Sequence, residues 1–278
     1  MLGPAGLLGR IEEYYDAVPR SGARAERFGP LTLFVREGSG GPYYARPALG
    51  APEAAGVADV DLVRARQREL GVPEAFEWVA ETTPGLRAAV EASGLTVHEH
   101  PLMVHDPAAA PDRPAELAPD GGRTAVVRLL SAQDPALASA LGVMWAAFGE
   151  PGTAVGSGGA EELAAQILAR TADGTLTRTA ERITAGYTVV AAALADGQAL
   201  GSGQHQPVGT VSEIVGVGTL PNARRQGLGL AVTAALLADA RAGGVETVFL
   251  TATDEAVARI YARLGFRRIA TALIAETS

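Results

Sequence analysis

Strand-like and helix-like segments alternate along the second half of this 278-residue chain, and one junction between them is very short. Apolar and small residues at 211–220 are typical of a strand. An apolar helical stripe then begins at Leu228 and continues through Val232 and Leu236. Between the two lies the basic, glycine-rich turn at 224–229, Arg-Arg-Gln-Gly-Leu-Gly. This order predicts an α/β layered fold in which a strand leads directly into the N-terminus of a helix.

The same patterns assign the other elements. In the second half we expect strands at 123–131, 245–252 and 266–275, a hairpin at 187–204 turning at Asp196-Gly197, and helices at 136–149, 159–172 and 254–265. In the first half we expect strands at 30–38, 42–49, 74–81 and 95–104, and helices at 57–71 and 83–94.

The clearest composition break lies at 105–122, which is rich in Pro, Ala and Asp and lacks an apolar period. It predicts a linker at 106–122 between an N-terminal domain at 1–105 and a C-terminal domain at 123–278. The halves also resemble each other when Gly94 is aligned with Gly265, because strand, short helix, glycine and strand follow in the same order. Duplication is the economical interpretation, and chance similarity of short units is the alternative.

Composition excludes several functional classes. The net charge of −8, from 31 acidic and 23 basic residues, argues against a nucleic-acid partner. The chain has no cysteine, which excludes disulfides, thiolate metal ligands and a covalent cysteine intermediate. The first residues form a poor signal peptide, and no apolar run is long enough to cross a bilayer. We therefore expect a soluble cytoplasmic protein without a membrane partner, as a monomer or homodimer.

The turn at 224–229 has the chemistry of an anion site. The first turn of a helix has unpaired N–H groups and a partial positive charge. Gly227 and Gly229 leave that backbone accessible, and Arg224 and Arg225 add positive charge. The alternative is a solvated basic loop before an ordinary helix, and a single G-x-G is too common to decide between them.

The context of the turn is more specific. The segment from Thr219 to Gly229 resembles the R/Q-x-x-G-x-G/A loop that binds the acyl-CoA pyrophosphate in the GNAT superfamily of N-acetyltransferases. The later segment from Asp254 through Tyr261 to Gly265-Phe266 looks like the second signature of that family. The resemblance covers 123–278 and implies tandem GNAT-like halves with a mixed, mainly antiparallel sheet flanked by helices. The first half lacks both signatures, with Val90 in the place of Tyr261, so it is interpreted as a degenerate half. An unrelated α/β partner domain is the alternative.

The resemblance implies acetyl-CoA, an acyl-CoA donor, as the cofactor. In the family, the strand before the loop separates from its neighbour and binds the pantetheine arm, and here that strand includes Gly216 and Gly218. Glycine on a strand permits a bulge or the close approach of a ligand, although it also simply weakens a strand. The implied cofactor-binding residues are Val217, Gly218, Thr219, Arg224, Arg225, Gln226, Gly227, Leu228, Gly229, Leu230 and Asp254.

Acetyl transfer to an amine needs a base for the ammonium and an acid for the departing thiolate. Tyr261 matches the tyrosine that many GNAT enzymes use as the general acid, and its alternative is a core aromatic residue. Glu213 lies at the spacing from Gly227 that the histone-acetyltransferase branch uses for its general base, and its alternative is a surface or ion-paired strand residue. His205 is a second candidate base, although a single strand histidine is more often structural. Without cysteine, the amine is expected to attack the thioester directly.

The acceptor is the least defined part of the prediction. Trp145, Phe148 and Glu150 are candidates for an aromatic and acidic wall beside a cationic amine, or for a helix stripe that ends in a loop. We expect a small-molecule amine as the acceptor. A protein or peptide acetyltransferase and a non-catalytic acyl-CoA-binding module remain alternatives. His98 and His100 share one side of a strand, but no third ligand stands out nearby, so no metal site is expected.

Overall fold

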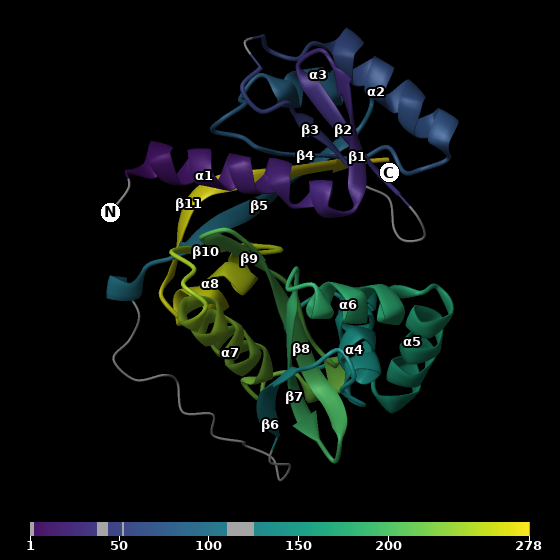
Figure 1. The fold of residues 1–278 in the computed structure, drawn as a ribbon, viewed down its shortest axis with the longest axis vertical. Helices are drawn as coiled ribbons and strands as arrows, with labels where there is room; N and C mark the ends of the chain where they lie inside the picture. The colour runs from purple at the N-terminus through teal and green to yellow at the C-terminus, as the bar shows by residue number, and fades with distance from the viewer. Residues whose placement is uncertain (1–2, 38–43, 52, 110–124, 278) are drawn as a thin grey trace. The chain divides into compact units, whose positions relative to one another are not determined.

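The computed structural model describes residues 3–37, 44–51, 53–109 and 125–277. The chain forms two compact units, and Figure 1 shows that each combines strands with flanking helices. Unit 1 contains Met1–Met103, Thr251–Glu255 and Arg268–Ser278, and unit 2 contains Val104–Leu250 and Ala256–Arg267. Each unit is therefore a mixed α/β layer structure, as the sequence predicts. Within the described residues, no helix is both long enough and apolar enough to cross a membrane.

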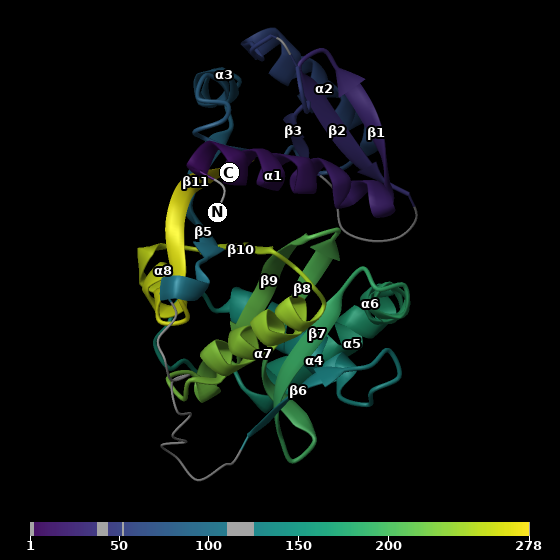
Figure 2. The same cartoon turned by 60° about the vertical axis from the view of Figure 1, so that its left-hand side comes forward.

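Unit 2 is built around a sheet with the strand order β10-β9-β8-β7-β6. Neighbouring strands are antiparallel except for β9 and β10, which are parallel. Helix α7 covers one face of this sheet, and α4, α5 and α6 lie on the other (Figures 1 and 2). Its elements are β6 (Val126–Leu130), α4 (Leu137–Gly149), α5 (Ala160–Ala172), α6 (Thr175–Thr184), β7 (Val189–Ala195), β8 (Gln198–Val208), β9 (Val211–Thr219), η3 (Pro221–Ala223), α7 (Leu228–Ala242), β10 (Thr247–Thr251) and α8 (Glu255–Ala262).

Glycines in β8 and β9 let helices approach both faces of this sheet closely. A Cβ on Gly218 would lie 2.8 Å from the Ala147 Cβ of α4. On the other face, a Cβ on Gly203 would lie 2.9 Å from a methyl group of Val217 and 3.2 Å from one of Val232 in α7. The 2.8 Å and 2.9 Å separations are shorter than those of real side chains, so packing on α4 requires a glycine at Gly218, and Val217 of the neighbouring strand requires one at Gly203.

Unit 1 has the strand order β1-β2-β3-β4-β11-β5. Helix α1 lies on one face of its sheet, and α2 and α3 lie on the other (Figures 1 and 2). The core includes Val60 and Val63 of α2, Val90 of α3 and Trp78 of β4. Its elements are α1 (Pro4–Ala17), η1 (Pro19–Ser21), β1 (Ala23–Phe28), β2 (Leu31–Arg36), β3 (Ala45–Pro47), α2 (Val57–Leu70), β4 (Phe76–Val79), α3 (Leu86–Ala92), β5 (Thr96–His105), η2 (Pro107–Ala109) and β11 (Phe266–Glu276).

The last strand of the chain differs from the predicted range of the C-terminal domain. Residues Arg268–Ser278 group with unit 1. Within that unit, β11 pairs antiparallel with β4, and Leu273 and Ala275 are buried in the unit 1 core. A strand pattern shows that a strand exists but not which strand it pairs with. The predicted C-terminal domain at 123–278 therefore includes β11 because of its place in the chain, whereas most of β11 belongs to unit 1.

Most predicted elements are present close to their expected positions, and three segments were missed. Strand β1 is rich in charge and has no buried residue, so it lacks a strong apolar pattern. Helix α6 also has no buried residue, but Leu176, Ala180 and Ile183 share one face of it, and this amphipathic pattern was missed. Helix α1 lies almost entirely within the N-terminal segment that the sequence analysis assessed only as a signal peptide. Most of the predicted linker, and residues 39–41 between the predicted strands at 30–38 and 42–49, lie outside the described residues.

Candidate functional site

The two parallel strands at the centre of the site separate part of the way along their length. The pairing of β9 with β10 ends at Ile214 and Leu250, although β9 continues to Thr219. Beyond Ile214 the β10-facing edge of β9 is not paired with β10, so its main-chain groups can bind an extended ligand. This is the separation that the family resemblance implies.

A bulge on the other edge of β9 accompanies this separation. The pairing of β8 with β9 shifts between Ser202 and Gln204, which face Gly218 and Val215, so that β9 has an extra residue there. Gly216 lies in this stretch with φ of +63°, in the left-handed region that favours glycine. A Cβ on Gly216 would also lie 2.8 Å from the Met144 sulfur. A bulge, one of the roles considered for these glycines, is present here, and the group that approaches Gly216 closely is Met144 of α4.

The turn between β9 and α7 holds two left-handed residues. Arg225 has φ of +68° and Gly227, the N-cap of α7, has φ of +74°. Such turns direct backbone N–H groups into a concave surface that binds anions. The N-cap makes no side-chain hydrogen bond, and the first turn of α7 has no acidic residue. The left-handed conformation costs a non-glycine residue about 1–2 kcal/mol, and such strain is concentrated at functional sites.

The two arginines of this turn have different surroundings. The Arg224 guanidinium donates to three main-chain carbonyls, at 3.1 Å to Ala147, at 3.3 Å to Ala154 and in a shorter contact to Glu150. Arg225 is exposed and has no hydrogen bond or ion pair to any residue that the structure describes. Both were predicted to bind the cofactor, but the Arg224 side chain is already engaged within the protein, and Arg225 is the accessible cation.

The remaining predicted cofactor residues surround the same turn, with one exception. Gly229 packs on the end of β9, where its Cβ would lie 3.4 Å from the Thr219 hydroxyl and 3.8 Å from a Val217 methyl group. Gly218, Leu228 and Leu230 are buried, and Gln226 is half-buried. Asp254 is exposed and belongs to unit 1.

Tyr261 lies on α8 with its side chain almost fully buried. Its ring meets Phe266 edge-on, with ring centroids 6.1 Å apart. Its hydroxyl makes no hydrogen bond to the described residues and is not among their fully enclosed, unpartnered polar atoms. Burial raises the pKa of Tyr261 to about 12, so the hydroxyl keeps its proton throughout the physiological range. This is the protonation state that an acid or hydrogen-bond donor requires.

The two candidate bases lie in different surroundings. His205 is buried, and its Nδ1 and Nε2 lie 2.8 Å from the Ser212 hydroxyl and 2.9 Å from the Asp239 carboxylate. Both ring nitrogens are thus engaged in a link between β8, β9 and α7, which gives His205 a structural role. Glu213 is half-buried and, by strand alternation, lies on the opposite face of β9 from Ser212. It is therefore on the face that α4 covers.

The three residues predicted to form the acceptor wall, Trp145, Phe148 and Glu150, have different surroundings. Trp145 and Phe148 are 47% and 55% exposed, and the Arg170 guanidinium lies 4.3 Å from the Trp145 ring centroid. The Glu150 carboxylate accepts the N–H groups of Ser157 at 3.2 Å and Gly158 at 3.0 Å. The Glu150 side chain therefore stabilises the loop between α4 and α5 rather than facing an open acceptor site. The sequence analysis missed this role, for which the glycine cluster at 156–159 was the available signal.

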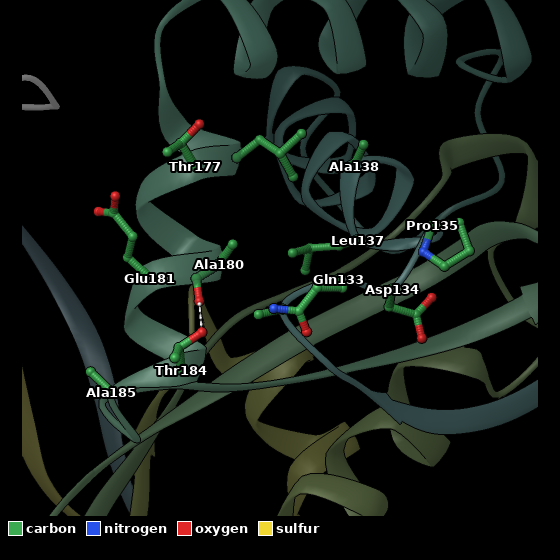
Figure 3. Close-up of a pocket in the computed structure, with 12 residues that line it drawn as sticks. Gln133, Asp134, Pro135, Leu137, Ala138, Thr177, Ala180, Glu181, Thr184 and Ala185 are labelled. Carbon is green, nitrogen blue, oxygen red and sulfur yellow. Dashed lines mark hydrogen bonds between the residues drawn. The ribbon is translucent and has the colours of Figure 1, made fainter.

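A separate open pocket of about 750 Å³ lies between the β6–α4 loop, the start of α4 and α6 (Figure 3). Leu137 and Ala138 line it from α4, and Thr177, Ala180 and Glu181 line it from α6. None of the predicted cofactor or catalytic residues lines this pocket. The pocket is therefore distinct from the turn and strand edge described above.

The corresponding region of unit 1 has the opposite electrostatic character. At the N-terminus of α2, the Asp59 carboxylate accepts the Gly56 N–H at 2.9 Å, so a negative charge already occupies the helix end. Strand β3, the counterpart of β9 in element order, carries Arg46, which is 2% exposed and pairs with Glu12 at 2.8 Å. The Arg46 guanidinium also stacks on Tyr15, 4.6 Å from its ring centroid. Arg46 is thus held by two side chains of α1.

Comparison with known proteins agrees with this geometry. Residues 160–266 match the acetyltransferase (GNAT) family. A GCN5-related N-acetyltransferase from Kribbella flavida has a similar fold, with a TM-score of 0.65 and 22% identity, over 97% of this chain and 95% of that chain. A tandem GNAT protein from the clavulanic acid biosynthesis pathway is similar with a TM-score of 0.56 and 18% identity, over 89% of this chain and 78% of that chain.

A third similar fold is that of a GCN5-related N-acetyltransferase from Sphaerobacter thermophilus, with a TM-score of 0.54 and 15% identity, over 99% of this chain and 93% of that chain. No curated protein matches the chain. The family match covers all of β9, α7 and α8, the elements that form the separated strand edge, the basic turn and the position of Tyr261. Residues 160–266 are therefore a GNAT-family acetyltransferase domain.

Proposed function

We propose that this protein is an acetyl-CoA-dependent N-acetyltransferase that modifies a primary amine of a small molecule. One combination of features carries the proposal: the unpaired edge of β9 leads directly to the left-handed turn at the N-terminus of α7. An extended pantetheine arm suits the strand edge, and a pyrophosphate suits the turn. The arrangement therefore matches the shape and charge of an acyl-CoA.

In this proposal the backbone of the turn binds the cofactor more than its side chains do. The N–H groups of Gly227, Leu228 and Gly229 meet the pyrophosphate at the positive end of α7. Arg225 adds the accessible positive charge. Its backbone is in the strained left-handed conformation, and such strain is common at ligand-binding sites. The β9 main chain from Val215 to Thr219 holds the pantetheine arm and polarises the thioester carbonyl.

The acceptor amine attacks the thioester carbonyl carbon, and the C–S bond breaks to release the CoA thiolate. Glu213, directly or through water, takes the proton that the ammonium must lose. The Tyr261 hydroxyl, which its raised pKa keeps protonated, donates its hydrogen to the departing sulfur, and the second proton lost by the attacking nitrogen restores the phenol. The chain has no cysteine to carry an acetyl intermediate, so transfer is direct.

We also propose that only unit 2 binds the cofactor and that unit 1 is a degenerate GNAT-like half. The α2 N-terminus of unit 1 carries Asp59, whose charge repels a phosphate, whereas the first turn of α7 has no acidic residue. Arg46 of β3 is buried and already paired with Glu12. One acetyl-CoA per chain is therefore expected.

The exposed aromatic residues Trp145 and Phe148 favour an acceptor with an apolar body. Thiol release from acetyl-CoA, measured over a panel of apolar amines, polyamines, amino acids, aminoglycosides and peptides, tests the proposal. We expect one or more small amines to accelerate release at least tenfold over the amine-free rate. Acceleration by peptides alone would replace the small-molecule acceptor with a protein. Acetyl-CoA binding without acceleration by any amine would favour a non-catalytic binding module.

A further inference from the structure

Arg224 belongs to the sequence motif of the cofactor loop, yet its side chain reaches a different part of unit 2. Its Nη2 donates to the carbonyls of Ala147 and Glu150, and its Nη1 donates to that of Ala154. Ala147 lies in the last turn of α4, where carbonyls lack helical partners and the helix dipole is negative. The guanidinium therefore caps the C-terminus of α4 and binds the loop that follows it.

The backbone ties the same two segments together. The Gly156 N–H donates to the Pro221 carbonyl at 2.9 Å, and the Asn222 N–H donates to the Gly158 carbonyl at 3.0 Å. The α4–α5 loop (150–159) thus runs beside the short helix η3, which precedes Arg224 in the chain. Two backbone bonds and one guanidinium join the loop to the cofactor turn.

The glycines of the α4–α5 loop fit this junction closely. A Cβ on Gly156 would lie 1.6 Å from the Glu150 carboxylate and 2.9 Å from the Pro221 Cβ. A Cβ on Gly159 would lie 2.3 Å from the Asn222 side-chain nitrogen. The glycines therefore permit tight packing of the α4–α5 loop against η3 at this junction.

We infer that Arg224 is a positioning residue that holds the α4–α5 loop on the cofactor turn and thereby controls acceptor binding, while Arg225 provides the cation for the cofactor. The inference rests on the proposed function, in which Phe148, at the end of α4, borders the acceptor. The planar guanidinium reaches three carbonyls, whereas a lysine ammonium is a single point of charge. Arg224 therefore acts through the geometry of its donors as well as through its charge.

The test compares Arg224→Gln and Arg224→Lys with the neighbouring control Arg225→Gln. Amide hydrogen exchange of 150–159 is measured in the absence of any ligand, so this result does not depend on activity. We expect exchange to rise about tenfold or more in both Arg224 variants, because a hydrogen bond from a charged donor is worth at least about that factor. In Arg225→Gln, exchange of the loop stays at the wild-type rate.

Calorimetry with acetyl-CoA at low and high salt separates the two arginines further. We expect Arg225→Gln to weaken acetyl-CoA about tenfold at low salt and to reduce the salt dependence of binding. The Arg224 variants change that affinity by less than about threefold, and their KM rises mainly for the best amine of the panel. Failure of every amine would defeat the proposed function but leave the exchange result to decide the role of Arg224.

Three outcomes would overturn the inference. They are unchanged loop exchange in Arg224→Gln, recovery of wild-type exchange in Arg224→Lys, and a loss of acetyl-CoA affinity in Arg224→Gln that equals the loss in Arg225→Gln. If Arg224→Gln does not fold, Glu150→Gln tests the same junction. It weakens the bonds to Ser157 and Gly158, so we expect faster exchange at these two amides with acetyl-CoA affinity within about twofold.

Discussion

Tyr261→Phe removes one hydroxyl from α8 and leaves the buried ring in place. The hydroxyl has no hydrogen-bond partner among the described residues, so its loss leaves no polar group unpaired. The ring keeps its edge-on contact with Phe266. We therefore expect the free energy of unfolding to change by less than about 0.5 kcal/mol and acetyl-CoA affinity to stay within about twofold.

The expected effect is on the chemical step. A positioned acid contributes roughly 10²–10⁴-fold to a rate, or about 3–5 kcal/mol of transition-state stabilisation, so kcat should fall by that factor. The pKa of about 12 also predicts the pH profile of the wild-type enzyme. Since the phenol ionises only near that pH, the wild-type rate should show no alkaline decline caused by loss of this proton below about pH 11.

The assay measures thiol release at saturating acetyl-CoA with the best amine of the panel, together with thermal unfolding. Tyr187→Phe is the matched control, because Tyr187 is 47% exposed and lies outside the proposed site. Its kcat should equal that of the wild type. A kcat within about twofold of wild type in Tyr261→Phe would refute the assignment of Tyr261 as the acid. A large loss of stability would show instead that the hydroxyl is structural.

Three further predictions concern the base and the stability of unit 1. Glu213→Gln should lose most activity at low pH and recover in part as pH rises, because free amine then forms without a base; a uniform loss across pH would argue against this role. Burial raises the folded-state pKa of Glu77 to about 7, so stability should fall as pH rises from about 4.5 to 7. Glu77→Gln should then stabilise β4 against hydrogen exchange by up to about 3 kcal/mol at pH 8 and by little at pH 4, and equal effects at both would contradict this reasoning. Deletion of 268–278 removes most of β11 and the buried residues Leu273 and Ala275, so limited proteolysis should cleave unit 1 rapidly while unit 2 resists. Unchanged resistance of unit 1 would show that its fold does not need β11.

Local sequence patterns were sufficient to predict the basic turn before α7. The strand, the basic turn and the helix from Val211 to Ala242 are adjacent in the chain, so their order determines their junction. The left-handed conformation at Gly227 is one that glycine favours, so the sequence is consistent with it. The same conformation at Arg225 could not be predicted, because arginine rarely adopts it and only the surrounding structure holds it there.

Long-range contacts were not predictable in the same way. Arg224 contacts carbonyls at positions about 70 residues away, and no sequence spacing reports such a contact. His205 was identified as a candidate base, but its partners Ser212 and Asp239 come from two other elements. The placement of β11 in unit 1 likewise depends on its pairing with β4, a strand about 200 residues earlier in the chain. The sequence thus indicates which residues are chemically capable, and the tertiary fold decides which of them are available.

The central claim is that a single acetyl-CoA binds unit 2 along β9 and at the turn before α7. A crystal structure of the protein with acetyl-CoA tests it most directly. The account predicts one cofactor per chain, with its pyrophosphate on the backbone N–H groups around Gly227–Gly229, its pantetheine arm along Val215–Thr219 and Arg225 near a phosphate. Cofactor at the α2 N-terminus beside Asp59, or equal occupancy in both units, would contradict it.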